Sequence, residues 1–293
     1  MAYVASNDPK PSFDKVRTMR DSVIPEDRMT LAFYGVCHDS HSVQDFYLQT
    51  LEFFTKCLYT PDYLAVHGNG HTSKLGSFKR IDARLRKTGF GGVEGFEIVT
   101  ALPNPKTRGR DFVAKCMCHT RDNGYLAIAV PGTTREISQL LEFSTSIISN
   151  LKPEYGIGYL RDLKYGPTGF AIGLGGAFPD AVTAGRRDGT HNITAWSSYG
   201  MKHALYRKGI LRDIYEWNYL SPSQLQNKVG TLTLEKWITH DSSRGMLRKL
   251  GPGAIWDLPE TAIVGVRSSL TEAKLISDYQ DFIGKRGSTC VAD

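Results

Sequence analysis

Residues 125–160 read YLAIAVPGTTREISQLLEFSTSIISNLKPEYGIGYL, and this stretch decides the fold. A short apolar run is followed by a segment whose apolar side chains recur at helical spacing, and then by a second apolar run. Thr133 and Glu136 stand three apart where the helix would begin, as in a capping box, and Pro153 stands just past its end. The stretch therefore predicts a strand, a helix over residues 133–151, and another strand.

A similar arrangement precedes it, because residues 42–59 also show helical spacing and strand-like segments flank them. The turn sequence RDNG at 121–124 predicts a hairpin. The strands expected from apolar runs cover residues 31–37, 63–67, 94–102, 111–117, 125–130, 155–160 and 170–174. We therefore predict an α+β fold with mostly antiparallel sheets from two βαβ-like units, helices packed on one face, and a C-terminal α/β extension.

The chain divides into three parts on this pattern. Residues 1–27 form an N-terminal arm, residues 28–178 an α+β domain whose element order suggests two related halves, and residues 179–293 a C-terminal extension packed on the first domain. The extension consists of short elements, each marked by local signals. These are a helix start at Ser221-Pro222, helices at 234–239 and 259–270, and a hairpin of 246–250 with 254–258.

Composition is that of an ordinary globular protein, with 41% hydrophobic and 23% charged residues. No apolar run approaches the ~18–20 residues that cross a bilayer, and the first residues lack the pattern of a secretory signal. The five cysteines form no CxxC pair, which favours free thiols in a reducing compartment. We expect a cytoplasmic protein that does not contact membranes.

No catalytic signature is present, so we predict no catalytic residue, no metal and no cofactor, and we favour a non-enzyme. GxSxG is absent, and the glycine-rich residues 89–95 lack a strand–turn–helix context. An enzyme with an unrecognised site near His38, His41, His67 and His71 is one alternative. Two glycines between His67 and His71 indicate a turn rather than a helical metal site.

A basic stretch supports a second alternative, a nucleic-acid-associated protein. Phosphates would contact its Lys and Arg side chains, and Phe78 and Phe90 would stack on bases. A solvated face that keeps sheet edges from aggregating would explain the same charges. The residues are Lys79, Arg80, Arg84, Arg86, Lys87, Arg108 and Arg110, with Lys106 among them.

Two later segments combine Arg with Tyr and Trp, the side chains that dominate binding hot spots. The first is residues 155–176. The second begins LRDIYEWNYL at residue 211 and closes with LEKWI at 234–238. A large core with a buried ion pair would use the same side chains. The predicted binding residues are Arg161, Arg212, Asp213, Tyr215 and Trp217.

Four motifs carry a family resemblance that spans Tyr155 to Leu270. They are YGIGY at 155–159, YGPTGFAIG at 165–173, LRDIYEWNYLSPSQL at 211–225 and TLEKWI at 233–238. They resemble bacterial proteins of the type VI secretion immunity-like class. That resemblance implies binding and blocking of a cognate toxin, without catalytic residues. The basic pI of about 9.0 differs from the acidic face expected of an inhibitor that mimics phosphates.

The leading hypothesis is therefore a non-catalytic protein-binding protein of bacterial conflict or defence, with a protein partner. Nucleic acid is the alternative partner, and the oligomeric state stays open.

Overall fold

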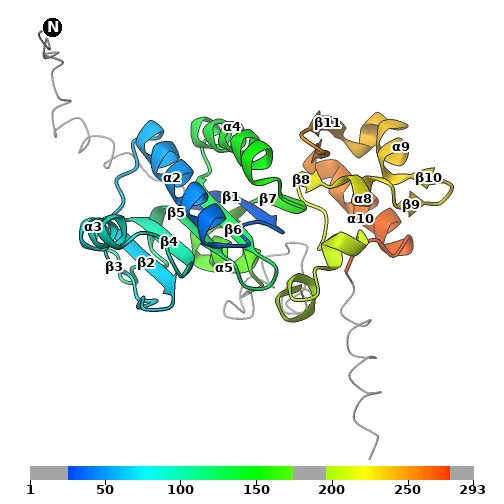
Figure 1. Cartoon of the computed structure of the whole chain (residues 1–293). Coiled ribbons are helices and arrows are strands. Elements are labelled where there is room, and N and C mark those ends of the chain that lie inside the picture. Colours follow the sequence, from blue (N-terminus) through cyan, green and yellow to red (C-terminus); the bar gives the residue numbers. More distant parts are fainter. Residues whose placement is uncertain (1–25, 174–195, 278–293) are drawn as a thin grey trace, which may run out of the picture.

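A single ten-stranded antiparallel sheet runs through the molecule in the computed structural model, which describes residues 26–173 and 196–277 (Figure 1). Its strand order is β11-β12-β8-β7-β1-β6-β5-β4-β2-β3. The strands are β1 (Asp27–Tyr34), β2 (Tyr63–Gly68), β3 (Gly76–Ser77), β4 (Val93–Ala101), β5 (Phe112–His119), β6 (Tyr125–Pro131), β7 (Tyr155–Asp162), β8 (Trp217–Leu220), β11 (Met246–Leu250) and β12 (Gly253–Asp257). A separate pair joins β9 (Lys228–Val229) to β10 (Leu232–Thr233).

Seven α-helices pack alongside this sheet in the part of the chain that the structure describes. They are α2 (Ser40–Lys56), α3 (Phe78–Thr88), α4 (Thr134–Leu151), α5 (Pro167–Ala171), α8 (Pro222–Leu225), α9 (Leu234–Thr239) and α10 (Glu260–Glu272). The predicted α+β class with antiparallel pairing is confirmed.

Two crossovers give the βαβ-like units that the sequence predicts. β6 and β7 both pair antiparallel with β1, so they run parallel to each other, and α4 connects them. In the other unit, α2 carries the chain from β1 across to β2. α4 begins at the cap that the sequence predicts, Thr133, whereas α2 begins at a cap that was not predicted, Asp39. Asp39 accepts a hydrogen bond from the Ser42 backbone N–H at α2, and Thr133 accepts one from Glu136 at α4.

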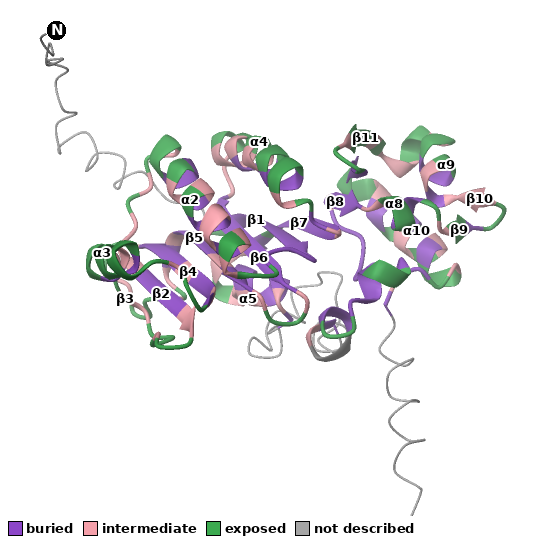
Figure 2. Cartoon of the chain, viewed as in Figure 1, coloured by how far each residue is buried: buried purple, intermediate pink, exposed green. Residues whose placement is uncertain are grey.

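Apolar side chains cover both faces of the sheet, because successive residues of a strand point to opposite sides. Leu31 and Phe33 of β1 face α2 and α4, whereas Ala32 and Tyr34 face α5 and the C-terminal elements. The two long helices share one face as predicted. The opposite face is also covered, which differs from the prediction, since its apolar strand residues also need shielding from water (Figure 2).

The predicted strand at 170–174 is wrong. Residues 167–171 form α5, and Leu174 lies outside the described residues. Gly166 adopts a left-handed conformation at φ 59°, and Pro167 occupies the first helical turn, where its missing N–H costs nothing. Phe170 and Ala171 then pack against Tyr34, and the Tyr34 hydroxyl donates to the Ala171 carbonyl at 2.7 Å.

The C-terminal elements continue the same sheet through β8, which pairs with β7. Gly156 and Gly158 of β7 permit this close packing, because a Cβ at either position would lie within 3.1 Å of side chains on both neighbouring strands. The predicted hairpin forms as β11 and β12, and the two predicted helices form as α9 and α10. The proposed boundary at 178/179 lies outside the described residues, as does most of the predicted N-terminal arm.

No helix among the described residues is both long and apolar enough to span a bilayer. Four cysteines lie in this part of the chain, and all four are free thiols. They are Cys37, Cys57, Cys116 and Cys118.

Candidate partner-binding site

The five residues singled out for partner binding all lie in the interior, each less than a tenth exposed. They are Arg161, Arg212, Asp213, Tyr215 and Trp217. The guanidinium carbons of Arg161 and Arg212 both lie over the Phe170 ring, 4.0 and 4.3 Å from its centroid. These cation–π contacts hold α5 against β7 and the segment before β8.

The other contacts are also internal. Asp213 accepts two hydrogen bonds from Arg267 of α10, Nε to Oδ1 at 2.5 Å and Nη2 to Oδ2 at 2.7 Å. Trp217 points to the opposite face of the sheet and meets Phe33 edge-on at 5.6 Å. A large core with a buried ion pair describes these contacts. Partner binding by these five residues stays a prediction, and it would require the surrounding chain to move.

A groove in the C-terminal part is bordered by two other residues: Arg244, whose side chain is a quarter exposed, and Trp237, which is itself only 9% exposed. Thr233 caps α9 by accepting a hydrogen bond from the Lys236 backbone N–H, and Trp237 then lies one turn into the helix. Asp241 accepts a hydrogen bond from the Ser243 backbone N–H and starts a short 3₁₀ turn, Ser242–Arg244. This turn brings Arg244 back over α9.

Arg244 is held in place from several sides. Its guanidinium carbon lies 4.1 Å from the Trp237 ring centroid, and its Nη1 donates to the Trp237 carbonyl at 2.6 Å. Asp241 Oδ2 lies 3.5 Å from its Nε, and hydrogen bonds from Ser243 lower the pKa of that carboxyl group. The Trp256 indole donates to the Arg244 carbonyl at 2.7 Å. Arg244 is therefore preorganised before any partner arrives.

A groove of about 490 Å³ separates this wall from one side of α10. Small side chains line the helix side, at Ala262, Gly265 and Ser269. A Cβ at Gly265 would meet nothing within 4 Å. The complete lining is Trp237, Ser243, Arg244, Pro259, Thr261, Ala262, Gly265, Val266 and Ser269. A partly exposed arginine beside a smooth helix face suits a short protein segment that carries a carboxylate.

A second, smaller groove of about 170 Å³ lies between α2 and α4. Phe53 and Phe143 stack at 4.4 Å within it, and Lys56 pairs with Glu142 across it at 2.7 Å. Because these contacts join the two helices directly, this groove has less room for a partner.

The predicted basic residues occupy α3 and the loop between β4 and β5, and all are exposed. Arg86 pairs with Asp82 at 2.9 Å. The two predicted stacking residues are partly buried: Phe78 packs on the core, and Phe90 meets Tyr47 edge-on at 5.3 Å. The cations therefore lie at the surface, whereas the two aromatic rings pack within the fold.

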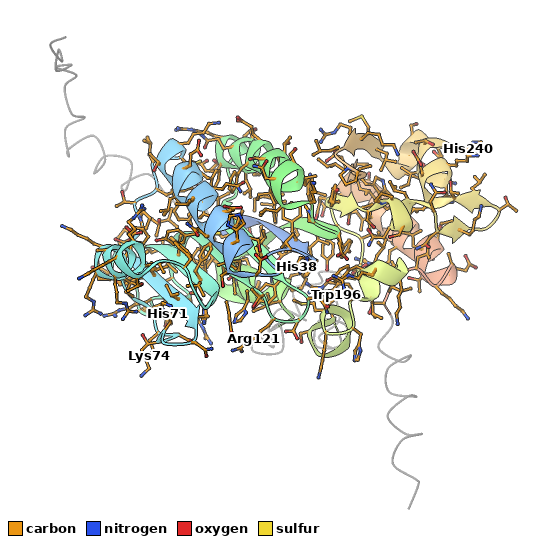
Figure 3. The ribbon with its side chains drawn as sticks, in the orientation of Figure 1. His38, His71, Lys74, Arg121, Trp196 and His240 are labelled. Atoms are coloured by element: carbon orange, nitrogen blue, oxygen red, sulfur yellow. The ribbon has the colours of Figure 1, made fainter. Side chains whose placement is uncertain are left out.

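The structure does not bring the four predicted histidines together. His38 and His41 are exposed at the start of α2, and the His71 backbone N–H closes a turn onto the Gly68 carbonyl. Figure 3 shows His38 and His71 well apart. His67 instead meets His119 of β5, with ring centroids 5.3 Å apart. No three His, Cys, Asp or Glu side chains within residues 26–173 and 196–277 are arranged to hold a metal ion.

Burial keeps this histidine pair uncharged. It lowers the pKa of His67 and, together with the positive charge of Arg121 nearby, lowers the pKa of His119 to about 4. The Arg121 backbone N–H donates to His119 Nδ1 at 3.1 Å, so the neutral ring carries its proton on Nε2. That buried Nε2 has no hydrogen-bond partner.

Sequence reasoning missed Arg244 and the groove side of α10. A signal was present in α10, because Ala262, Gly265 and Ser269 recur at intervals of three and four and so share one face. Arg244 had no comparable signal, since its position over Trp237 depends on the turn between them.

No family model and no curated protein matches this chain. Among solved structures, it is similar to one described as "Pseudomonas aeruginosa T6SS protein PA0821". The TM-score is 0.55 and the sequence identity 13%, over 90% of this chain and 84% of the other. The chain thus shares its α+β fold with a protein associated with type VI secretion.

Proposed function

We propose that this chain is a non-catalytic protein-binding protein of bacterial conflict, of the immunity type, and that its partner docks in the groove beside α10. The observation that carries this proposal is the Arg244–Trp237 wall, which hydrogen bonds fix in place opposite the small-residue side of α10. The fold likeness to a type VI secretion protein supports the same biological setting.

The occupant is a short protein segment with a carboxylate next to small apolar side chains. The carboxylate would pair with the Arg244 guanidinium, whose side chain is a quarter exposed. The apolar atoms would lie along Ala262 and Gly265. Interface energy concentrates in buried arginine and tryptophan contacts, so truncation of such a residue costs ~2–4 kcal/mol of binding.

The test uses a variant that blocks the groove without unfolding the helix. Gly265→Gln adds a side chain where space is open, and Gln is the better helix former by up to about 1 kcal/mol. Tagged full-length protein is expressed in its native host, and co-purified proteins are identified by mass spectrometry. We expect one protein in near-stoichiometric amount with the wild type, and its loss with Gly265→Gln and with Arg244→Ala.

Ser268→Gln provides the matched control, because Ser268 is exposed on the same helix and does not line the groove. It should retain the partner. Equal retention by Gly265→Gln and the wild type would remove the groove from the proposal. Recovery of no stoichiometric partner with the wild type would refute the function itself.

A further inference from the structure

The positive charge of this chain is concentrated in one segment. Residues 63–121 contain eleven Lys and Arg against four Asp and Glu. The other residues together contain 25 Lys and Arg against 26 Asp and Glu, which follows from the totals of 36 and 30. Outside this segment, the chain is therefore almost neutral.

Five of the exposed cations lie along α3 and the loop that leads into β3, at the β2–β3 edge of the sheet: Lys74, Lys79, Arg80, Arg84 and Lys87. Those of the β4–β5 loop lie on the opposite face, because that loop covers Tyr63 whereas α3 packs on Leu64 and Val66, and Arg121 follows β5 at the other end of the strands. Arg80 of α3 lies close to Gly76 of β3, because a Cβ at Gly76 would be 3.4 Å from its Nη2. From the β4–β5 loop, Arg108 lies over the Tyr63 ring of β2 at 5.1 Å. Figure 3 shows Lys74 far from His240 of the C-terminal elements.

Most of these cations lack ion-pair partners within the described residues. The eight are Lys74, Lys79, Arg80, Arg84, Lys87, Lys106, Arg108 and Arg121, all of them exposed. Arg80, Arg84 and Lys87 follow one another at intervals of four and three along α3, so they repel each other. Because no carboxylate in the described part of the chain offsets this repulsion, the surface favours binding of a negatively charged partner.

The surroundings favour a phosphate backbone over an acidic protein. Protein interfaces have an apolar centre, but no exposed large hydrophobic residue lies in this segment. The exposed ones among the described residues are Leu48, Leu58, Leu160, Met246 and Val264. Bases are not read here either, since Arg108 covers Tyr63, and Phe90 packs on Tyr47. What remains for a ligand is a spread of exposed guanidinium and ammonium groups.

We infer that the exposed surface of α3, together with Lys74 of the loop that leads into it, binds the phosphate backbone of a nucleic acid without sequence preference. Arginine forks match phosphate oxygens, and each contact releases a condensed counterion. If four or five of these cations contact phosphates, the affinity for duplex DNA should fall with salt at a log–log slope of about −4. This surface lies outside the groove beside α10.

Fluorescence anisotropy with a labelled 20-base-pair duplex DNA tests the inference between about 50 and 200 mM KCl, a range in which such contacts lose most of their affinity. The triple variant Arg80→Gln, Arg84→Gln, Lys87→Gln keeps good helix formers in α3. It should bind at least about tenfold more weakly at 100 mM salt, and its slope should shrink by about two to three. A second, scrambled duplex should bind with the same affinity.

The triple variant Lys208→Gln, Lys228→Gln, Lys236→Gln removes the same charge from exposed positions elsewhere. It should leave the affinity within about twofold, because phosphate contacts act over short range at these salt concentrations. Equal weakening by both triple variants would overturn the inference, since net charge alone would then explain binding. The inference would also be overturned if the protein did not bind DNA at 50 mM salt. Binding of a polyglutamate-tagged carrier protein without any binding of DNA would overturn it as well. Gly265→Gln should bind DNA normally, which keeps this test separate from that of the groove.

Discussion

The two ends of the sheet differ in whether their exposed Lys and Arg side chains form ion pairs. In residues 63–121, which include the β2–β3 end, eight exposed cations have no carboxylate partner among the described residues. At the β11–β12 end, Arg248 pairs with Asp257 at 2.8 Å and Lys249 with Glu235 at 2.6 Å. Unpaired charges attract a partner over a distance and respond to salt, whereas a fixed arginine such as Arg244 selects a partner by geometry.

The largest expected effect lies at the paired end, in the buried ion pair. Asp213→Asn should lower the free energy of unfolding by about 3–5 kcal/mol, because it removes the charge of a buried carboxylate that accepts two hydrogen bonds from Arg267. Urea denaturation at pH 7 measures the loss. A loss below about 1 kcal/mol would show that this pair does not hold α10 to the sheet.

The second effect is a dependence of folding stability on pH, which comes from His119 of β5. An unfolded histidine titrates near pH 6.5, whereas the pKa of folded His119 is about 4. Between these values the unfolded chain binds a proton that the folded chain does not. Stability is therefore complete above pH ~6.5 and falls as the pH drops towards 4, by as much as ~3 kcal/mol.

Urea denaturation of the wild type and His119→Gln from pH 7 to 4.5 checks this sign. The variant should lose less stability over that range, since its side chain does not titrate. Parallel curves for the two proteins would mean that another group carries the acid sensitivity. Val264→Gln, at an exposed position of α10, supplies a control whose stability should change with pH as that of the wild type does.

The smallest effects differ in sign between the two ends. Arg84→Gln should raise the free energy of unfolding by ~0.2–0.5 kcal/mol, because it relieves repulsion from Arg80 and Lys87. Lys249→Gln should lower it by ~0.2–1 kcal/mol, because Glu235 loses its partner. Both changes should shrink in 1 M salt, where screening is strong. If both substitutions changed the free energy of unfolding in the same direction, the two ends would not differ in ion pairing as described.

Local sequence signals predicted most of the regular elements. The apolar pattern placed α2, α4, α9 and α10, because each helix shields its own apolar stripe, and a capping residue marked the start of α4. The failure at α5 has a local cause as well: alternating glycine and apolar residues resembled a strand, while Gly166-Pro167 started a helix. The sequence did not show which faces of the sheet the helices cover, because the central strands are apolar on both sides.

The candidate sites were less accessible to sequence reasoning. The predicted cations of α3 proved to be exposed, because charged residues on the outer side of an amphipathic helix stay in water. The predicted aromatic and arginine residues proved to be buried, because the same side chains serve a core or an interface equally well. Nothing in one dimension separates Trp217, which is internal, from Trp237, which borders a groove.

The sequence by itself determined the α+β class, the two crossover helices, and the excess of positive charge in residues 63–121. These features depend on periodicity and composition, which act over a few residues at a time. Only the tertiary structure decided which cations find carboxylates, that His67 meets His119, and that Arg244 faces α10 across a groove. Such pairings join residues far apart in the chain, and they form only when strand order and helix packing bring them within a few ångströms.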